Sequence, residues 1–156
     1  MKILALAVTL LLLAGCATPY QSGGFLGGYK EIQLDENVFQ VSFEGNAFVS
    51  AGRVENYTLL RSAEVAMENG YDYFVIVDQD AYETTGTHYT PATTYTSGSV
   101  SGNSFYGTTT TYGGMMNSYS KPSSSNTIVG YRDKPDGFSF RSENVVSSLR
   151  ASLGVR

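Results

Sequence analysis

The alternation of apolar and polar positions early in the chain predicts two successive strands. Residues 38–43 place Phe39, Val41 and Phe43 on one face at a period of two, which is the pattern of a half-buried strand. A shorter strand is expected over residues 29–34, because a turn signal separates the two segments. The folded part of the chain is therefore expected to begin with β structure.

The spacing of apolar residues then changes to that of a helix. Ser50 can cap a helix that runs to about Asn69, where Asn69-Gly70 provides a stop signal. Charged residues lie largely off its apolar stripe. The stripe consists of Val54, Tyr57, Leu60, Ala63, Ala66 and Met67. Directly after this helix, the apolar run 73–77 predicts a central strand that is buried on both faces.

The C-terminal part again predicts strands followed by a helix. Residues 124–131 return to strand character, and Phe138 and Phe140 alternate as in a short edge strand. Ser142 is expected to cap a final helix. The apolar stripe of that helix consists of Val145, Val146, Leu149 and Leu153. Together these elements predict an α/β fold of the α+β type, with a small mixed or antiparallel sheet of about four or five strands and two helices on one face.

A low-complexity insertion, residues 79–123, interrupts the predicted domain. Ser, Thr, Gly and Tyr make up 32 of the 48 residues from 79 to 126, and only three are charged. Such composition is typical of a disordered loop, yet Thr and Tyr also favour strands. The tyrosines lie symmetrically about a point after Val100, which would pair Tyr95 with Tyr106 in one long hairpin. The composition and the tyrosine spacing therefore leave two alternatives for this insertion, a disordered loop and an ordered hairpin.

The N-terminus carries a separate apolar signal. The apolar run 3–13 is 11 residues long, whereas a membrane-spanning helix needs about 20. We therefore expect residues 1–15 to be a signal peptide that is removed. The peptide ends in Leu13-Ala14-Gly15-Cys16, which is typical of a lipobox that is cleaved between Gly15 and Cys16.

Cys16 is the only cysteine and the expected site of lipid attachment. A single cysteine excludes an internal disulfide and a Cys-x-x-Cys redox pair. Two or three acyl chains would anchor the protein stably, because one chain binds a membrane only marginally. By resemblance to Gram-negative lipoproteins, Ala17 in place of Asp favours the outer membrane. We expect residues 16–28 to be a lipidated N-terminus with a flexible linker, and residues 29–156 to be one domain facing the periplasm.

A pattern of spaced residues over about 28–78 adds a resemblance. The pattern consists of Gly28, Tyr29, Glu31, Leu34, Asp35, Asn37, Phe39, Val41, Phe43, Gly45, Asn46, Arg61, Ala63, Glu64, Gly70, Tyr71, Tyr73 and Phe74. Together with the lipobox, it resembles a family of small, uncharacterised proteobacterial envelope lipoproteins. The resemblance implies an envelope lipoprotein with a small α/β domain, and it implies no activity and no catalytic residues.

The charge and the candidate polar residues favour binding over catalysis. A formal net charge of −4 is unsuited to nucleic acid, whose binding depends on neutralising phosphates. His88, the only histidine, would need a nucleophile and an orienting acid, and no Gly-x-Ser-x-Gly elbow is present. Asp78, Asp80 and Glu83 are candidate ligands for a hard cation such as Ca²⁺, although their ordinary interpretation is a strand exit and turn.

We therefore expect a non-enzymatic, lipid-anchored envelope protein that acts as a structural or binding module. Its expected partners are outer-membrane lipid, through acyl chains on Cys16, and an envelope protein or glycan contacted by the Tyr- and Thr-rich insertion. No cofactor is expected besides the covalent lipid. One alternative is an envelope hydrolase that uses His88 with an acidic partner. Another is a metal-responsive sensor that binds a cation through Asp78, Asp80 and Glu83.

Overall fold

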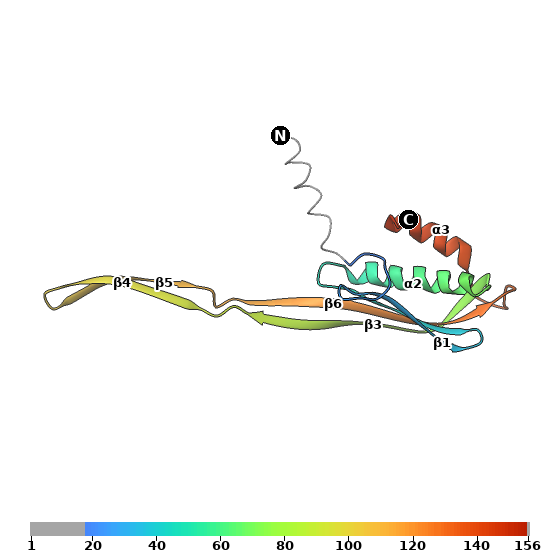
Figure 1. The fold of residues 1–156 in the computed structure, drawn as a ribbon, viewed down its shortest axis with the longest axis horizontal. Coiled ribbons are helices and arrows are strands. Elements are labelled where there is room, and N and C mark those ends of the chain that lie inside the picture. Colours follow the sequence, from blue (N-terminus) through green and yellow to red (C-terminus); the bar gives the residue numbers. More distant parts are fainter. Residues whose placement is uncertain (1–17, 156) are drawn as a thin grey trace, which may run out of the picture. The chain divides into compact units, whose positions relative to one another are not determined.

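The computed structural model describes residues 18–155, which form a small α+β fold, as predicted (Figure 1). Its elements are β1 (Gly28–Asp35), β2 (Val38–Glu44), α2 (Ala51–Glu68), β3 (Tyr73–Tyr89), β4 (Thr93–Ser101), β5 (Ser104–Tyr112), β6 (Met116–Tyr131), β7 (Phe140–Arg141) and α3 (Ser142–Leu153). The described chain separates into two compact units, one of residues 18–84 with 120–155 and the other of Thr85–Tyr119. The expected signal peptide, its cleavage after Gly15 and the lipid on Cys16 lie outside the described residues.

The first unit is built on a five-stranded antiparallel sheet in the order β1-β2-β6-β3-β7. Strand β2 pairs with β1 through Phe43 opposite Tyr29, and with β6 through Val41 opposite Asn126. This sheet has five strands, and β4 and β5 form a separate two-stranded sheet, which gives seven strands in the described chain where four or five were predicted. The central strand of the sheet is β6, which lies between β2 and β3.

Helix α2 covers one face of this sheet (Figure 1). Ser50 caps it as predicted, because its side chain accepts a hydrogen bond from the Arg53 backbone N–H at 3.4 Å. Burial of each large apolar side chain beneath the helix contributes about 1.5–3 kcal/mol. The buried core comprises Phe39, Val41, Phe43, Val49, Val54, Tyr57, Leu60, Ala63, Val65, Ala66, Phe74 and Ile128. Among residues 18–155, no helix has the length and apolar character needed to cross a membrane.

Helix α3 packs against α2, and its Val145 and Val146 contact the same core. The prediction that Ser142 caps this helix is wrong. Ser142 is the first residue inside the helix, and its buried hydroxyl donates to the Tyr71 carbonyl oxygen at 3.2 Å. Arg141 occupies the cap position without a side-chain hydrogen bond. The serine therefore attaches α3 to the segment before β3 and leaves the amides of the helix uncapped.

The run 73–77 forms a strand, but the prediction that it is buried on both faces is wrong. Phe74 is fully buried against the core, whereas Val77 on the opposite face is exposed. The physical reason is that α2 and α3 lie on the same side of the sheet (Figure 1). In the described part of the chain, the other face therefore has no helical layer to bury its valines.

The segment that we expected to be a flexible linker is folded onto the first unit from Thr18 onward. The buried Thr18 hydroxyl donates to the Leu26 carbonyl oxygen at 3.0 Å and accepts from the Asn46 N–H at 2.8 Å. The Tyr20 ring packs against those of Phe43 and Tyr57, which also contact each other. Glycines make a segment flexible only when its other side chains form no buried contacts. Thr18 and Tyr20 do form such contacts, so this segment is held on the first unit.

The second unit, Thr85–Tyr119, contains an antiparallel hairpin of β4 and β5. The tyrosine register predicted for it is wrong, because Tyr95 lies opposite Thr110 and Tyr106 lies opposite Ser99. A tight turn at Gly102-Asn103 sets the register, and Gly102 has a φ of +60°. A two-residue hairpin turn with a positive φ at its first position favours glycine there. Turn geometry therefore determines the pairing, and the symmetric spacing of the tyrosines does not.

Candidate functional site

A partly buried ionic network, here called the Arg61 network, joins β1, α2 and α3. The Arg61 guanidinium donates to both carboxylate oxygens of Glu31, at 3.2 and 3.0 Å. It also donates to both oxygens of Glu68, at 2.8 and 2.9 Å, and to Glu64 at 3.3 Å. Arg150 of α3 donates twice to the other oxygen of Glu64, at 3.1 and 2.7 Å. Two guanidinium groups thus share one buried carboxylate.

Tyr20 brings the N-terminal segment into the same network, because its hydroxyl donates to Glu64. Burial, followed by this hydrogen bond and by the Glu64 charge, raises the pKa of Tyr20 far above its ordinary value. Burial alone would lower the pKa of Arg61, but its hydrogen bonds to Glu31 and Glu68 outweigh burial and raise it. Both groups are therefore held firmly in their protonated forms, which is suited to structure and unsuited to proton transfer near neutral pH.

The Arg61 network explains several residues of the family-like pattern in structural terms. The Arg61 guanidinium lies over the Tyr29 ring, 4.7 Å from its centroid, and contacts Glu31 and Glu64. All four residues belong to the pattern. Phe39, Val41 and Phe43, which are also in the pattern, form the core beneath α2. These seven residues of the pattern therefore have structural roles in this unit, either in the ionic network or in the core.

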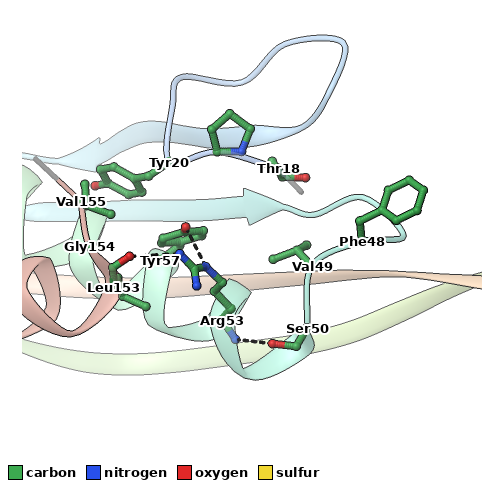
Figure 2. Close-up of a pocket in the computed structure, with 11 residues that line it drawn as sticks. Thr18, Tyr20, Phe48, Val49, Ser50, Arg53, Tyr57, Leu153, Gly154 and Val155 are labelled. Carbon is green, nitrogen blue, oxygen red and sulfur yellow. Dashed lines mark hydrogen bonds between the residues drawn. The ribbon is translucent and has the colours of Figure 1, made fainter. Parts of the chain in front are cut away.

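A pocket of about 700 Å³ lies beside this network, between the N-terminal segment, the start of α2 and the end of α3 (Figure 2). Inside it, Arg53 donates to the Tyr57 hydroxyl at 2.8 Å and to the Leu153 carbonyl oxygen at 3.0 Å. The lining residues are Thr18, Pro19, Tyr20, Phe48, Val49, Ser50, Arg53, Tyr57, Leu153, Gly154 and Val155. They include no histidine and no carboxylate that could serve as a general base.

His88, the candidate catalytic residue, lies on β3 within the second unit. That unit, Thr85–Tyr119, contains no aspartate and no glutamate. An acid to orient the imidazole would therefore have to come from outside the unit. The second unit thus provides no catalytic pair for the hydrolase alternative.

The carboxylates Asp78, Asp80 and Glu83 lie along β3. Side chains alternate between the faces of a strand, so Glu83 points away from the face that Asp78 and Asp80 share. Glu83 accepts a hydrogen bond from the Ser120 hydroxyl at 2.7 Å. Within residues 18–155, no group of three His, Cys, Asp or Glu side chains is arranged to hold a metal ion.

The hairpin of β4 and β5 presents two chemically different faces. Residues directly opposite each other share a face, and the tyrosine face carries Tyr95, Tyr106 and Tyr112. The rings of Tyr95 and Tyr112 meet edge to face, with centroids 6.2 Å apart. Hydroxyl pairs at 3.1 and 3.0 Å join the residues of the threonine face, which are Thr94 with Thr111 and Thr96 with Thr109. Every residue of both strands is exposed.

Comparisons with models of known protein families, with curated proteins and with solved structures find no match. No family is shown for the chain. The resemblance to proteobacterial envelope lipoproteins therefore stays a prediction.

The Arg61 network and the attachment of Thr18 were not predicted from the sequence. One signal for the network is present, because Arg61, Glu64 and Glu68 follow one another at spacings of three and four residues on one side of a helix. Nothing local indicates that Glu31 and Arg150, which lie far away in the chain, complete it. Thr18 and Tyr20 carry no distinguishing pattern in a segment dominated by glycine.

Proposed function

We propose that this chain is a lipid-anchored protein of the bacterial envelope that acts by binding, with the tyrosine face of the β4–β5 hairpin as its contact surface. The lipobox ending in Cys16 supports the anchor, and Ala17 after it supports the outer membrane, with the domain facing the periplasm. The pocket and the second unit provide no catalytic pair, which supports binding over hydrolysis.

The observation that carries the proposal is the composition of the second unit. From Thr84 to Ser120 the chain contains no charged residue, and yet β4 and β5 are exposed along their whole length. Soluble surfaces are usually rich in charge, so an uncharged, aromatic surface needs another explanation. Contact with a neutral partner explains why tyrosine and threonine replace charged residues there.

The partner that suits this surface is an envelope glycan or an uncharged protein surface. Tyrosine combines a flat apolar ring with a hydroxyl that forms hydrogen bonds, and both properties suit sugar rings. The tyrosine face combines three such rings with the hydroxyls of Ser97, Ser99 and Thr110. Binding to this face should depend weakly on salt, because it involves no ion pairs.

The test compares two sets of substitutions on opposite faces of the hairpin. The first variant replaces Tyr95, Tyr106 and Tyr112 with Ser, and the matched control replaces Thr94, Thr96 and Thr109 with Ser. Each lipidated protein is measured for co-sedimentation with purified peptidoglycan sacculi, and for crosslinked protein partners in native envelopes. We expect the tyrosine variant to lose binding at least tenfold, since each aromatic contact contributes about 0.5–1.5 kcal/mol. Unchanged binding of the tyrosine variant in both measurements would rule out this contact surface.

A further inference from the structure

We propose that Phe25, Leu26 and Phe48 form a membrane-docking face, which enters the interfacial layer of the phospholipid bilayer that holds the Cys16 lipid. This inference rests on the proposed lipid anchor and adds a second contact to it. The partner that we assign to this exposed apolar surface is a lipid bilayer and not a protein.

The three side chains are unusually exposed for their type. Phe25 is fully exposed, Phe48 is 71% exposed and Leu26 is 50% exposed. A single exposed apolar residue needs no explanation. These three, however, lie on two loops, residues 21–28 and 45–50, and neither loop contains a charged residue. Such loops lack the strongly hydrated groups that would resist entry into a lipid interface.

Thr18 ties both loops together at one point. Its hydroxyl donates to the carbonyl oxygen of Leu26 at 3.0 Å and accepts from the backbone N–H of Asn46 at 2.8 Å. The Asn46 side chain in turn accepts from the backbone N–H of Phe48 at 2.9 Å. Thr18 and Phe48 both line the pocket in Figure 2, where the Phe48 ring is turned away from Arg53 and Tyr57. The apolar loops are thus attached to the residue where the described chain begins.

The length of chain before Thr18 leaves little room between this point and the bilayer. Only Ala17 separates Thr18 from Cys16, and two residues of fully extended chain span at most about 7 Å. A lipid on Cys16 therefore brings the bilayer surface close to Thr18 and to the loops attached to it. Entry of an aromatic side chain into an apolar environment is favourable, because its apolar surface leaves water. The docked face would then fix the orientation of the first unit on the membrane.

The chain contains no tryptophan, so a single substitution gives a site-specific fluorescent probe. Phe25→Trp, Phe48→Trp and the control Phe138→Trp are each prepared as the lipidated full chain. Phe138 is a suitable control because it is 75% exposed but lies before the start of α3. Leu153, at the other end of that helix, lines the pocket. A helix of this length spans about 18 Å, which separates the control position from the pocket. Each protein is placed in vesicles of phosphatidylethanolamine and phosphatidylglycerol with brominated acyl chains, which quench tryptophan on contact.

We expect blue-shifted emission and at least twofold quenching for Phe25→Trp and Phe48→Trp, and neither change for Phe138→Trp. Thermal melting of each variant checks that the fold is retained, and mass spectrometry reports lipid on Cys16. If Cys16 carries lipid but the loop probes behave like Phe138→Trp, the docking face is overturned while the proposed anchor stands. Equal quenching of all three probes also overturns it, because contact would then not be confined to this face. An unmodified Cys16 removes both the anchor and the docking inference.

Discussion

Thr18 and Tyr20 determine how the N-terminal segment is held on the first unit. Thr18 is buried and hydrogen-bonded to two loops, and Tyr20 places its ring in the aromatic core and its hydroxyl on Glu64. In each side chain, the apolar part is packed against the unit and the hydroxyl forms hydrogen bonds. As a consequence, little free chain remains between the folded unit and Cys16.

The raised pKa of Tyr20 predicts a loss of stability at alkaline pH. The unfolded chain releases the Tyr20 proton near the ordinary tyrosine pKa of about 10, whereas the folded chain retains it. The stabilisation is therefore fully present below pH 10 and decreases above it, by up to about 1.4 kcal/mol per pH unit. In Tyr20→Phe this contribution is absent, so its free energy of unfolding should fall less steeply between pH 10 and 11.5 in urea titrations. Equal slopes for the two proteins would show that Tyr20 titrates normally in the folded state.

Removing Arg61 should destabilise the protein far more than removing an exposed base. The Arg61 side chain is 10% exposed and its loss leaves the buried Glu64 with fewer partners, so we expect Arg61→Met to cost about 3 kcal/mol in urea unfolding. The matched control is Lys30→Met, since Lys30 is 59% exposed and pairs only at the surface with Glu44. That change should cost under about 1 kcal/mol. A cost for Arg61→Met no larger than the control would mean that the network contributes nothing to folding.

At the scale of elements, local patterns predicted those parts that depend on neighbouring residues. The alternation of Phe39, Val41 and Phe43 identified β2, and the Ser50 cap with its apolar stripe identified α2. Burial of 73–77 was overestimated, because it depends on which sheet face the helices cover, and no local pattern specifies that. The hairpin register was missed because a two-residue turn at Gly102-Asn103 outweighs the tyrosine spacing.

The β4–β5 hairpin should depend on Phe105, whose ring covers two glycines that have no side chains of their own. A Cβ added at Gly98 would lie 2.5 Å from this ring, and one at Gly107 would lie 2.6 Å from it. Aromatic cover of a glycine stabilises a strand pair. Phe105→Ala should therefore reduce amide hydrogen-exchange protection of 93–112 by about fivefold, which corresponds to about 1 kcal/mol.

The control for this experiment is Val100→Ala. Val100 lies directly opposite Phe105 and is similarly exposed. Unlike Phe105, it has no aromatic ring that could cover the two glycines. We expect it to leave protection within about twofold of the unchanged chain. If both variants lose the same protection, the effect is one of general apolar loss and the specific role of Phe105 is refuted.

At the scale of the whole molecule, the sequence predicted the class of fold, while the site could be predicted only in part. The α+β class follows from hydrophobic periodicity. The Arg61 network could not be predicted, because Glu31, Glu64 and Arg150 meet only after three elements have packed. The Tyr- and Thr-rich composition identified the candidate binding surface, but the assignment of its tyrosines to one face required the register of the hairpin.

Both functional proposals depend on the state of Cys16, which is the only cysteine in the chain. The most direct measurement is tandem mass spectrometry of the N-terminal peptide from protein extracted from native envelopes, with Cys16→Ala as the control. We predict a mature chain that begins at Cys16 and carries a diacylglyceryl thioether, with an additional acyl chain on its amine. The Cys16→Ala control should retain residues 1–15 and lack lipid. A wild-type peptide with an unmodified Cys16, or one still joined to residues 1–15, would contradict the proposal of a lipid-anchored envelope protein.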